Sequence, residues 1–371
     1  MPVVSIKKFD YIDALRGIAI IMVMMVHTSH RVAPGKGLAS DIMTNGGKGV
    51  QLFYIISALT LCFSLRSRKQ KESKYILYFF IRRFFRIAPL FYVAMFFYLY
   101  LYNVGGNYYM PNGLKNWYII AAGFFMHGWH PETINGIVPG SWSIAVEFTF
   151  YLSLPFIFCL IDNKFKAFLF LIVSIIAGSL ITRWIYEYWS GIYPADQKYL
   201  AWGVSYYGFF NQLPVFATGI LLYHIFQDNI FNSKRSVSIA CVILSVTLMF
   251  SSDYLDNYIN NLVIFAFAFA LLTYALANYK LTFFVNRFTI YIGRISFGMY
   301  LFHFAVIKYF NSQRFFGLSE YSTYGTLIAL LMVITATAFI TTFTYYFIEK
   351  KGIKLGQTVI NKIERRTVLD Q

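Results

Sequence analysis

The stretch LRGIAIIMVMMVHTSH, residues 15–30, is an apolar run that carries one arginine near its start and two histidines near its end. A helix that crosses the hydrocarbon core of a bilayer needs about 20 mostly apolar residues, and each charge within it costs at least about 2.5 kcal/mol. The apolar segment 12–30 has this length and still retains Arg16 and His27. Its length and internal arginine favour a retained membrane helix over a cleaved signal peptide.

The rest of the chain is equally apolar. Its 371 residues are 58% hydrophobic, 20% aromatic and only 13% charged, which excludes a soluble domain of this length. We therefore predict an all-α, polytopic integral membrane helical bundle of about ten transmembrane helices. A shorter apolar stretch at 117–126 is predicted to be a re-entrant or interfacial helix. The ten predicted segments are 12–30, 48–65, 82–102, 142–161, 165–186, 204–226, 236–251, 258–278, 290–310 and 324–347.

The positive charge indicates topology. The net charge of +16 gathers in alternate short connections, such as 66–74, the region of Lys164 and Lys166, and the region of Lys280 and Arg287, which is typical of cytoplasmic loops and not of a nucleic-acid site. We expect both termini in the cytoplasm and residues 103–141 as one outer excursion. The predicted organisation is a transmembrane domain at 1–350 and a short basic cytoplasmic tail at 351–371.

Arg16 and His27 are eleven residues apart, which is about three helical turns plus 20°, so they share a face and lie ~16 Å apart along the axis. Asp13, one turn before Arg16, is predicted to pair with it. His30 is expected off this face and outside the site. The alternative is that Arg16 extends to the cytoplasmic headgroups while His27 lies at the outer interface.

A second motif is YFFIRRFFRIAPLFY, residues 78–92. Arg83 and Arg86 are one turn apart, so their guanidinium groups can converge on one anion, with Arg82 as a third cation beside them. Arginine suits phosphate oxygens in particular. The alternative is a positively charged anchor at an anionic leaflet.

A third motif is PGSWSIAVEFTFYLSLP, residues 139–155, which contains Trp142, Ser143 and Glu147. Ser143 and Glu147 share a helical face, and a carboxylate at this depth requires a partner. The alternative is an interfacial glutamate that orients the helix. The candidate partners are Arg16, His27 and Lys48.

The remaining polar groups predict no metal site. His127 and His130 lack a convincing third ligand, and the cysteines Cys62, Cys159 and Cys241 lie apart in apolar segments. His303, within ISFGMYLFHFAVI (295–307), is expected to form a hydrogen bond between helices. Glu349, within FIEKKG, is expected to pair with the lysines that follow it.

Together, these motifs resemble acyltransferase family 3, the polytopic membrane acyltransferases that modify surface polysaccharides and other glycans. The resemblance extends over about residues 9–350. Arg16 and His27 match the first-helix signature, in which a basic residue is followed after ten residues by histidine. Arg83 and Arg86 match the paired-arginine stretch.

Two further motifs of the family are matched less completely. Glu147 matches the first residue of a Glu-Glu-Gln pattern whose other positions are Phe148 and Thr149 here, and His303 lies on the matching late helix. The resemblance implies a stand-alone form without an appended esterase-like domain.

The resemblance implies transfer of an acyl group, most often acetyl, from cytoplasmic acyl-coenzyme A to a hydroxyl of a glycan such as lipopolysaccharide O-antigen or exopolysaccharide. Acyl-coenzyme A is then a donor substrate and no cofactor is permanently bound. The expected location is a bacterial cytoplasmic (inner) membrane, where the partners are membrane lipids, the donor and the glycan. Alternatives are a transporter or flippase for a lipid-linked glycan or small anion, and an accessory membrane subunit.

The motif residues fit distinct roles in this reaction. His27 acts as general base or carries the acyl group. Arg16, oriented by Asp13, polarises the thioester or binds donor phosphate. Glu147 orients His27. The residues expected to bind donor phosphates are Arg82, Arg83 and Arg86, and the expected supporting residues are Trp142, Ser143 and His303.

Overall fold

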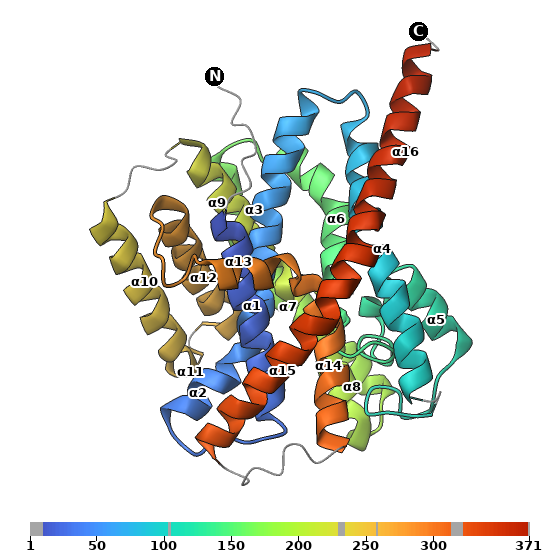
Figure 1. The fold of residues 1–371 in the computed structure, drawn as a ribbon, viewed down its shortest axis with the longest axis vertical. Helices are drawn as coiled ribbons and strands as arrows, with labels where there is room; N and C mark the ends of the chain where they lie inside the picture. Colours follow the sequence, from blue (N-terminus) through green and yellow to red (C-terminus); the bar gives the residue numbers. More distant parts are fainter. Residues whose placement is uncertain (1–9, 103–104, 229–233, 257–258, 313–321, 370–371) are drawn as a thin grey trace. The chain divides into compact units, whose positions relative to one another are not determined.

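The computed structural model describes residues 10–102, 105–228, 234–256, 259–312 and 322–369, and it confirms the predicted all-α class (Figure 1). In these ranges the only β-type pairing is an isolated bridge between Asn107 and Met110. The helices are α1 (Asp10–Ser29), α2 (Leu38–Thr44), η1 (Asn45–Lys48), α3 (Gly49–Lys69), α4 (Tyr75–Tyr102), α5 (Asn116–Gly123), η2 (His127–Trp129), α6 (Trp142–Leu160), α7 (Lys164–Ile192), η3 (Ala195–Gln197), α8 (Lys198–Tyr207), α9 (Phe209–Asp228), α10 (Arg235–Phe250), α11 (Ser252–Leu255), α12 (Asn261–Asn278), α13 (Arg287–Arg294), α14 (Ser296–Ser312), α15 (Thr323–Thr344), η4 (Tyr345–Glu349) and α16 (Lys350–Leu369).

The membrane-spanning pattern agrees with the predicted segments. Among the described residues, 8 helical segments are long and apolar enough to cross a membrane, or 9 if one bent pair counts as a span. The predicted segment 236–251 corresponds to α10, a shorter apolar helix. Helix α5 has 8 residues, ~12 Å by helical rise, so it is too short to cross.

The segment 290–310 differs from the single straight helix that its hydropathy predicted. It forms α13 and α14, which are bent by 79° at Ile295 (Figure 1). Ile295 has φ −99° and ψ 5°, outside the α-helical region, and the chain therefore changes direction there. The bend separates an amphipathic segment from an apolar one.

The chain divides into two compact units, which we describe separately. Unit 1 comprises Met1–Cys62, Ile161–Trp184 and Phe210–Ala338, and unit 2 comprises Phe63–Leu160, Ile185–Phe209 and Phe339–Gln371. Residues 1–9 and 370–371, which belong to the predicted membrane domain and tail, lie outside the described ranges.

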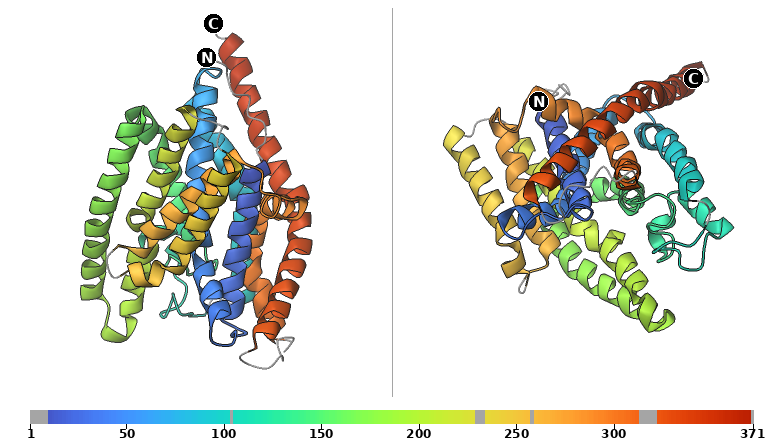
Figure 2. Two further views of the ribbon diagram at one scale, coloured as in Figure 1. Left: turned by 90° about the vertical axis from the view of Figure 1, so that its left-hand side faces the viewer. Right: turned by 60° about the horizontal axis from the view of Figure 1, so that its bottom comes forward.

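Unit 1 is built around the contact of α1 with α13. A Cβ added at Gly17 would overlap the carbonyl oxygen of Thr289, and one added at Gly293 would overlap that of Asp13. The two backbones therefore touch directly, which small residues allow in membrane bundles. Elsewhere in this unit α10 runs beside α12 (Figure 2). The Ser245 hydroxyl of α10 donates to the carbonyl of Ala268 of α12 at 2.7 Å.

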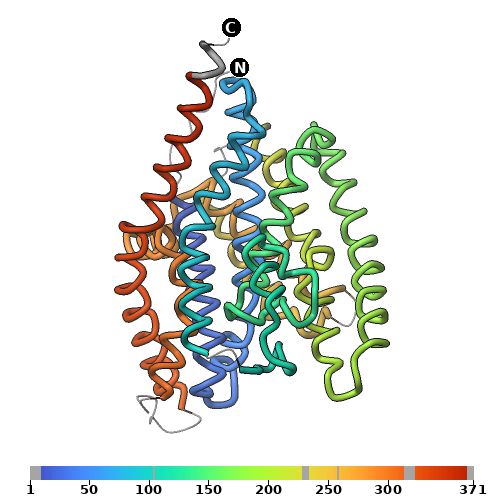
Figure 3. Tube along the Cα trace, turned by 90° about the vertical axis from the view of Figure 1, so that its right-hand side faces the viewer, coloured from blue at the N-terminus to red at the C-terminus, as the bar shows by residue number. Residues whose placement is uncertain are grey.

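Unit 2 contains a close contact between α4 and α16. Gly352 and Gly356 lie one turn apart on α16, and a Cβ added at Gly352 would be 2.6 Å from the carbonyl oxygen of Phe85. A Cβ added at Gly356 would be 2.9 Å from the Phe85 Cβ. The residues predicted to form a short tail thus form a helix that packs on α4, drawn in red in Figure 3.

The α1–α13 contact makes Gly293 intolerant of any side chain. We expect Gly293→Ala to destabilise the protein by about 1–3 kcal/mol, because the added methyl group must separate two backbones. Thermal unfolding of detergent-purified protein measures this effect. Gly191→Ala is the control, because an added Cβ there has no neighbour within 4 Å. Equal unfolding temperatures of both variants would contradict the contact.

Candidate active site

An acidic residue of α1 holds two arginines in unit 1. Asp13 is 4% exposed, and its Oδ1 lies 3.3 Å from a terminal nitrogen of Arg16, so the predicted pair is present. Its Oδ2 lies 3.3 Å from Nε of Arg294, the last residue of α13. Sequence reasoning missed Arg294, because only the folded contact between α1 and α13 brings it to Asp13.

The other end of α1 meets aromatic rings of α14. The ring centroid of His27 lies 5.3 Å from that of His303 and 4.4 Å from that of Phe304. His27 is half-buried, whereas His303 is 0% exposed. The structure therefore brings two of the predicted site residues together.

His30 also lies near His27, with 6.0 Å between the ring centroids. Whether His30 takes part in the site stays a prediction. A rotation of 300° forward around a helix is also 60° backward, so the two side chains leave α1 in similar directions. His30 itself is exposed, and burial lowers its pKa first, with the charge of Arg31 acting in the same direction.

The bonding of His303 fixes its tautomer. Nδ1 lies 2.8 Å from the carbonyl oxygen of Tyr300 and 3.2 Å from that of Met299. A carbonyl can only accept, so Nδ1 carries the ring proton and Nε2 is an acceptor. That Nε2 is buried and has no partner. In the structure the ring donates within its own helix, and the predicted hydrogen bond to another helix, for which Nε2 remains, stays a prediction.

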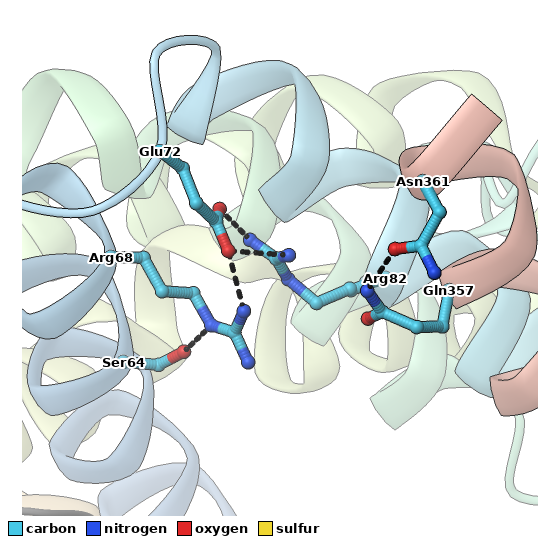
Figure 4. Close-up of polar contacts among 6 residues, drawn as sticks. All are labelled: Ser64, Arg68, Glu72, Arg82, Gln357 and Asn361. Carbon is cyan, nitrogen blue, oxygen red and sulfur yellow. Dashed lines mark hydrogen bonds and ion pairs between the residues drawn. The ribbon is translucent and has the colours of Figure 1, made fainter. Parts of the chain in front are cut away.

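In unit 2, the arginines of the second motif separate into two environments. Arg82 donates two hydrogen bonds to Glu72, at 2.7 and 3.1 Å, and Arg68 donates a third at 2.7 Å (Figure 4). Arg68 also donates to Ser64 at 3.3 Å. This network joins the end of α3 to the start of α4. The guanidinium of Arg82 is bound to Glu72 through both terminal nitrogens.

Figure 4 also shows a polar pair on the neighbouring helix α16. The Gln357 amide nitrogen donates to the side-chain oxygen of Asn361 at 2.8 Å, one turn along the same helix. Both ends of this bond come from α16, so it satisfies polar groups of that helix and leaves the Glu72 network separate.

Arg83 lies in a partly buried polar group with residues of α6. Its guanidinium carbon is 5.9 Å from the ring centroid of Tyr151, whose hydroxyl is hydrogen-bonded to both Arg83 and Glu147. Nε of Arg83 is buried without a partner. The partner found for Glu147 in this unit is therefore Tyr151, and its predicted pairing with Arg16, His27 or Lys48 of unit 1 stays a prediction.

Glu349 was not expected in this region. It is 4% exposed, its Oε1 has no hydrogen-bond partner, and the charge of Arg86 acts on it. It ends η4, a π-helical turn, and such turns often occur at functional sites. The predicted pairing with the following lysines is wrong, because Lys350 lies 4.2 Å from the ring centroid of Tyr346 and Lys351 lies 5.6 Å from that of Phe347.

The two supporting residues at the start of α6 have local contacts. The Trp142 ring lies 4.5 Å from that of Tyr207, and the Ser143 hydroxyl donates to the carbonyl of Gly140 at 3.2 Å. These contacts fix the entry of the chain into α6. Their supporting roles in the reaction stay predictions.

The excursion before α6 is held by a buried carboxylate. Glu132 accepts hydrogen bonds from the hydroxyls of Tyr118 and, at 3.1 Å, Tyr193, and Lys115 lies 3.6 Å away. Burial acts to raise the pKa of Glu132, but these hydrogen bonds and the Lys115 charge outweigh it and leave the pKa lowered.

The two histidines of the excursion are packed between aromatic rings. Burial lowers the pKa of His127 to about 4, and its Nε2 lies 3.0 Å from the carbonyl oxygen of Ser141. The His130 ring lies 4.9 Å from that of Trp117 and 5.0 Å from that of Trp189. In the part of the chain that the structure describes, no group of three His, Cys, Asp or Glu residues could hold a metal ion.

The sequence of the chain matches a known protein family. A sequence model of acyltransferase family 3 (Acyl_transf_3, an acyltransferase domain) matches residues 9–348. The chain belongs to acyltransferase family 3. This match includes the two histidines of unit 1, His27 and His303. It also includes the polar residues Arg83, Arg86 and Glu147 of unit 2.

Two bacterial relatives cover most of the chain. Peptidoglycan O-acetyltransferase OatA of Listeria monocytogenes serovar 1/2a is 25% identical over 339 residues, which are 82% of this chain and 50% of that protein. O-acetyltransferase OatA of Staphylococcus aureus strain NCTC 8325 is 24% identical over 383 residues, which are 92% of this chain and 57% of that protein. The chain thus spans about half the length of the relatives it matches. No solved structure matches it.

The Glu132 interactions give a pH-dependent contribution to stability. Because the folded pKa is lowered, this contribution is present above the ordinary pKa of about 4.3 and is lost as the pH falls through the folded value. We expect Glu132→Gln to reduce stability at pH 7 by about 1–3 kcal/mol, with the difference from the unmodified protein shrinking below pH ~4. Thermal unfolding of both proteins at pH 7 and pH 3.5 measures this difference in stability.

The control for this prediction is Asp253→Asn, which removes an exposed carboxylate in α11. It should leave the unfolding temperature unchanged at both pH values. A Glu132→Gln difference of the same size at pH 7 and pH 3.5 would show that the carboxylate charge is not what stabilises the excursion.

Proposed function

We propose that the protein is a membrane O-acyltransferase that moves an acyl group, in the simplest case acetyl, from cytoplasmic acyl-coenzyme A to a hydroxyl of a cell-surface or lipid-linked glycan. Family membership supports acyl transfer, and both relatives are named O-acetyltransferases. The observation that carries the proposal is His27, an imidazole in a membrane-spanning helix, half-buried beside His303. An ionisable group at such a position is costly and requires a function.

The proposed chemistry requires a group that accepts a proton. As general base, His27 removes the proton of the glycan hydroxyl while its oxygen attacks the thioester carbonyl. The carbon–sulfur bond breaks, and the imidazolium then returns the proton to the departing thiolate. As a covalent carrier, His27 attacks the carbonyl first, the carbon–sulfur bond breaks and the thiolate of coenzyme A leaves. The glycan oxygen then attacks the acyl-imidazole, the carbon–nitrogen bond breaks, and the hydroxyl proton passes to the thiolate or to water. Both routes begin with a neutral imidazole.

The donor site is proposed at Arg83 and Arg86. Coenzyme A carries several phosphates, and two guanidinium groups one turn apart are suited to bind them. Arg83 has a buried Nε without a partner, which leaves it a donor for a ligand oxygen. Arg82 is already occupied by Glu72, so its part in donor binding is smaller than the sequence suggested.

Arg16 is proposed to act on the donor side of His27. Asp13 pairs with the guanidinium in the first turns of α1, and this end of α1 is proposed to face the cytoplasm because of the charge pattern. From this position Arg16 can bind a donor phosphate or polarise the thioester. The proposed location is a bacterial cytoplasmic membrane with both termini in the cytoplasm.

The acceptor is proposed to be a glycan of the envelope. The name of one relative includes peptidoglycan. Peptidoglycan, O-antigen and exopolysaccharide are therefore the candidate acceptors for this chain. All three offer hydroxyl groups, and the proposed reaction requires no other group of the acceptor.

Replacing His27 tests the proposed function. We expect His27→Ala to reduce acyl transfer at least about 100-fold, because a general base contributes 10² to 10⁴ to the rate and a carrier contributes more. Transfer of radiolabelled acetyl groups from acetyl-coenzyme A to glycans, in membrane vesicles that contain the protein, measures the effect. The matched control is His224→Gln, at a buried histidine of α9. Full transfer by His27→Ala would refute the mechanism, and absence of transfer by the unmodified protein would favour transport.

The different environments of Arg82 and Arg86 give a second test. We expect Arg86→Gln to raise the KM for acetyl-coenzyme A about tenfold, which corresponds to about 1.4 kcal/mol of lost binding. In contrast, Arg82→Gln should lower the unfolding temperature and leave this KM within about twofold, because Glu72 loses one of its two arginine partners. Steady-state kinetics and thermal unfolding distinguish the two. An unchanged KM in Arg86→Gln would contradict donor binding by Arg86 and would leave it as a positively charged anchor at the membrane surface.

A further inference from the structure

The Nε2 atom of His303 is one of several buried side-chain polar atoms of unit 1 that have no hydrogen-bond partner, and it belongs to an imidazole. The side chain is 0% exposed, and Nδ1 donates to the Tyr300 carbonyl at 2.8 Å. This bond leaves Nε2 as an acceptor that has no partner. Buried polar atoms are nearly always hydrogen-bonded, so an orphaned acceptor in a membrane bundle requires an explanation.

The nearest imidazole to this acceptor belongs to His27. The two ring centroids are 5.3 Å apart, with 36° between the ring planes. Ring nitrogens lie about one ångström from the centroid, so this separation allows a hydrogen bond of about 3 Å when a nitrogen of each ring faces the other. Phe304 packs against both rings, at 4.4 Å from His27 and 4.2 Å from His303, and restricts other orientations.

We propose that His303 is the positioning residue of His27, and that its Nε2 accepts a hydrogen bond from one ring N–H of His27 so that the other ring nitrogen faces the reacting group. This inference rests on the proposed function. The arrangement follows the logic of a catalytic triad, in which a third group holds the histidine base in one tautomer. A neutral imidazole replaces the usual carboxylate here.

The neutral acceptor suits the apolar surroundings. A carboxylate at a fully buried position would need its own cationic partner, whereas a neutral imidazole needs none, and the bond to the Tyr300 carbonyl fixes the proton of His303 on Nδ1. When His27 accepts the proton of the glycan hydroxyl, both of its nitrogens carry hydrogen. One N–H donates to His303, and the other returns its proton to the leaving thiolate. His303 keeps its own proton on Nδ1 throughout.

Two isosteric replacements separate positioning from packing. The amide nitrogen of asparagine occupies the place of Nδ1, so His303→Asn keeps a donor for the Tyr300 carbonyl and loses the acceptor. The amide oxygen of glutamine reaches the place of Nε2, so His303→Gln restores the acceptor. A purely structural His303 would tolerate asparagine at least as well as glutamine.

The experiment compares kcat, KM for acetyl-coenzyme A and unfolding temperature for the two variants. We expect His303→Asn to reduce kcat about 100-fold and His303→Gln no more than about tenfold, with KM within about twofold and similar unfolding temperatures. Equal kcat values of the two variants would overturn the proposal. His303→Leu supplies a variant without any polar atom, and wild-type kcat in this variant would likewise overturn it.

His27→Ala, assayed in parallel, separates this inference from the proposed function. If His27→Ala abolishes transfer while His303→Asn and His303→Gln have the same kcat, only the positioning role fails. If His27→Ala retains transfer, the proposed function of His27 fails first, and the role of His303 fails with it.

Discussion

A buried carboxylate needs compensating positive charge from the protein, and Arg16 and Arg294 provide it for Asp13. The pairing with Arg294 depends on the close approach of α1 and α13, which Gly17 and Gly293 permit by having no side chain. The chain then bends by 79° into α14, the helix that carries His303 to His27. The ion pair, the glycine contact and the histidine cluster of unit 1 therefore form one connected arrangement.

Unit 2 solves the same problem of buried charge in two ways. Arg82 is satisfied by a bidentate pair with Glu72 near the ends of its helices, where such a network stabilises the hairpin of α3 and α4. Arg83 lies with Tyr151 and Glu147 and retains a donor without a partner. Adjacent arginines thus have different roles, because successive residues of a helix point in directions about 100° apart.

Much of this arrangement could be predicted from the sequence. Hydropathy located the spanning segments, and helical periodicity paired Asp13 with Arg16, because both signals are local in the chain. The bend at Ile295, the contact of Arg294 with Asp13 and the burial of Glu349 could not be predicted, because each depends on packing between distant segments. The nearness of His30 to His27 could have been predicted, since it follows from helical geometry alone. Tautomers such as that of His303 require the position of a carbonyl, which no sequence pattern supplies.

The central claim is that these buried polar groups serve acyl transfer to a glycan. The most direct measurement is the alkali-labile acetate of isolated envelope glycans, in cells that lack this protein and in cells that express either the unmodified chain or His27→Ala at equal levels. The account predicts that acetate is lost without the protein and is restored by the unmodified chain alone. Acetate that is unchanged by the deletion, or fully restored by His27→Ala, would contradict it.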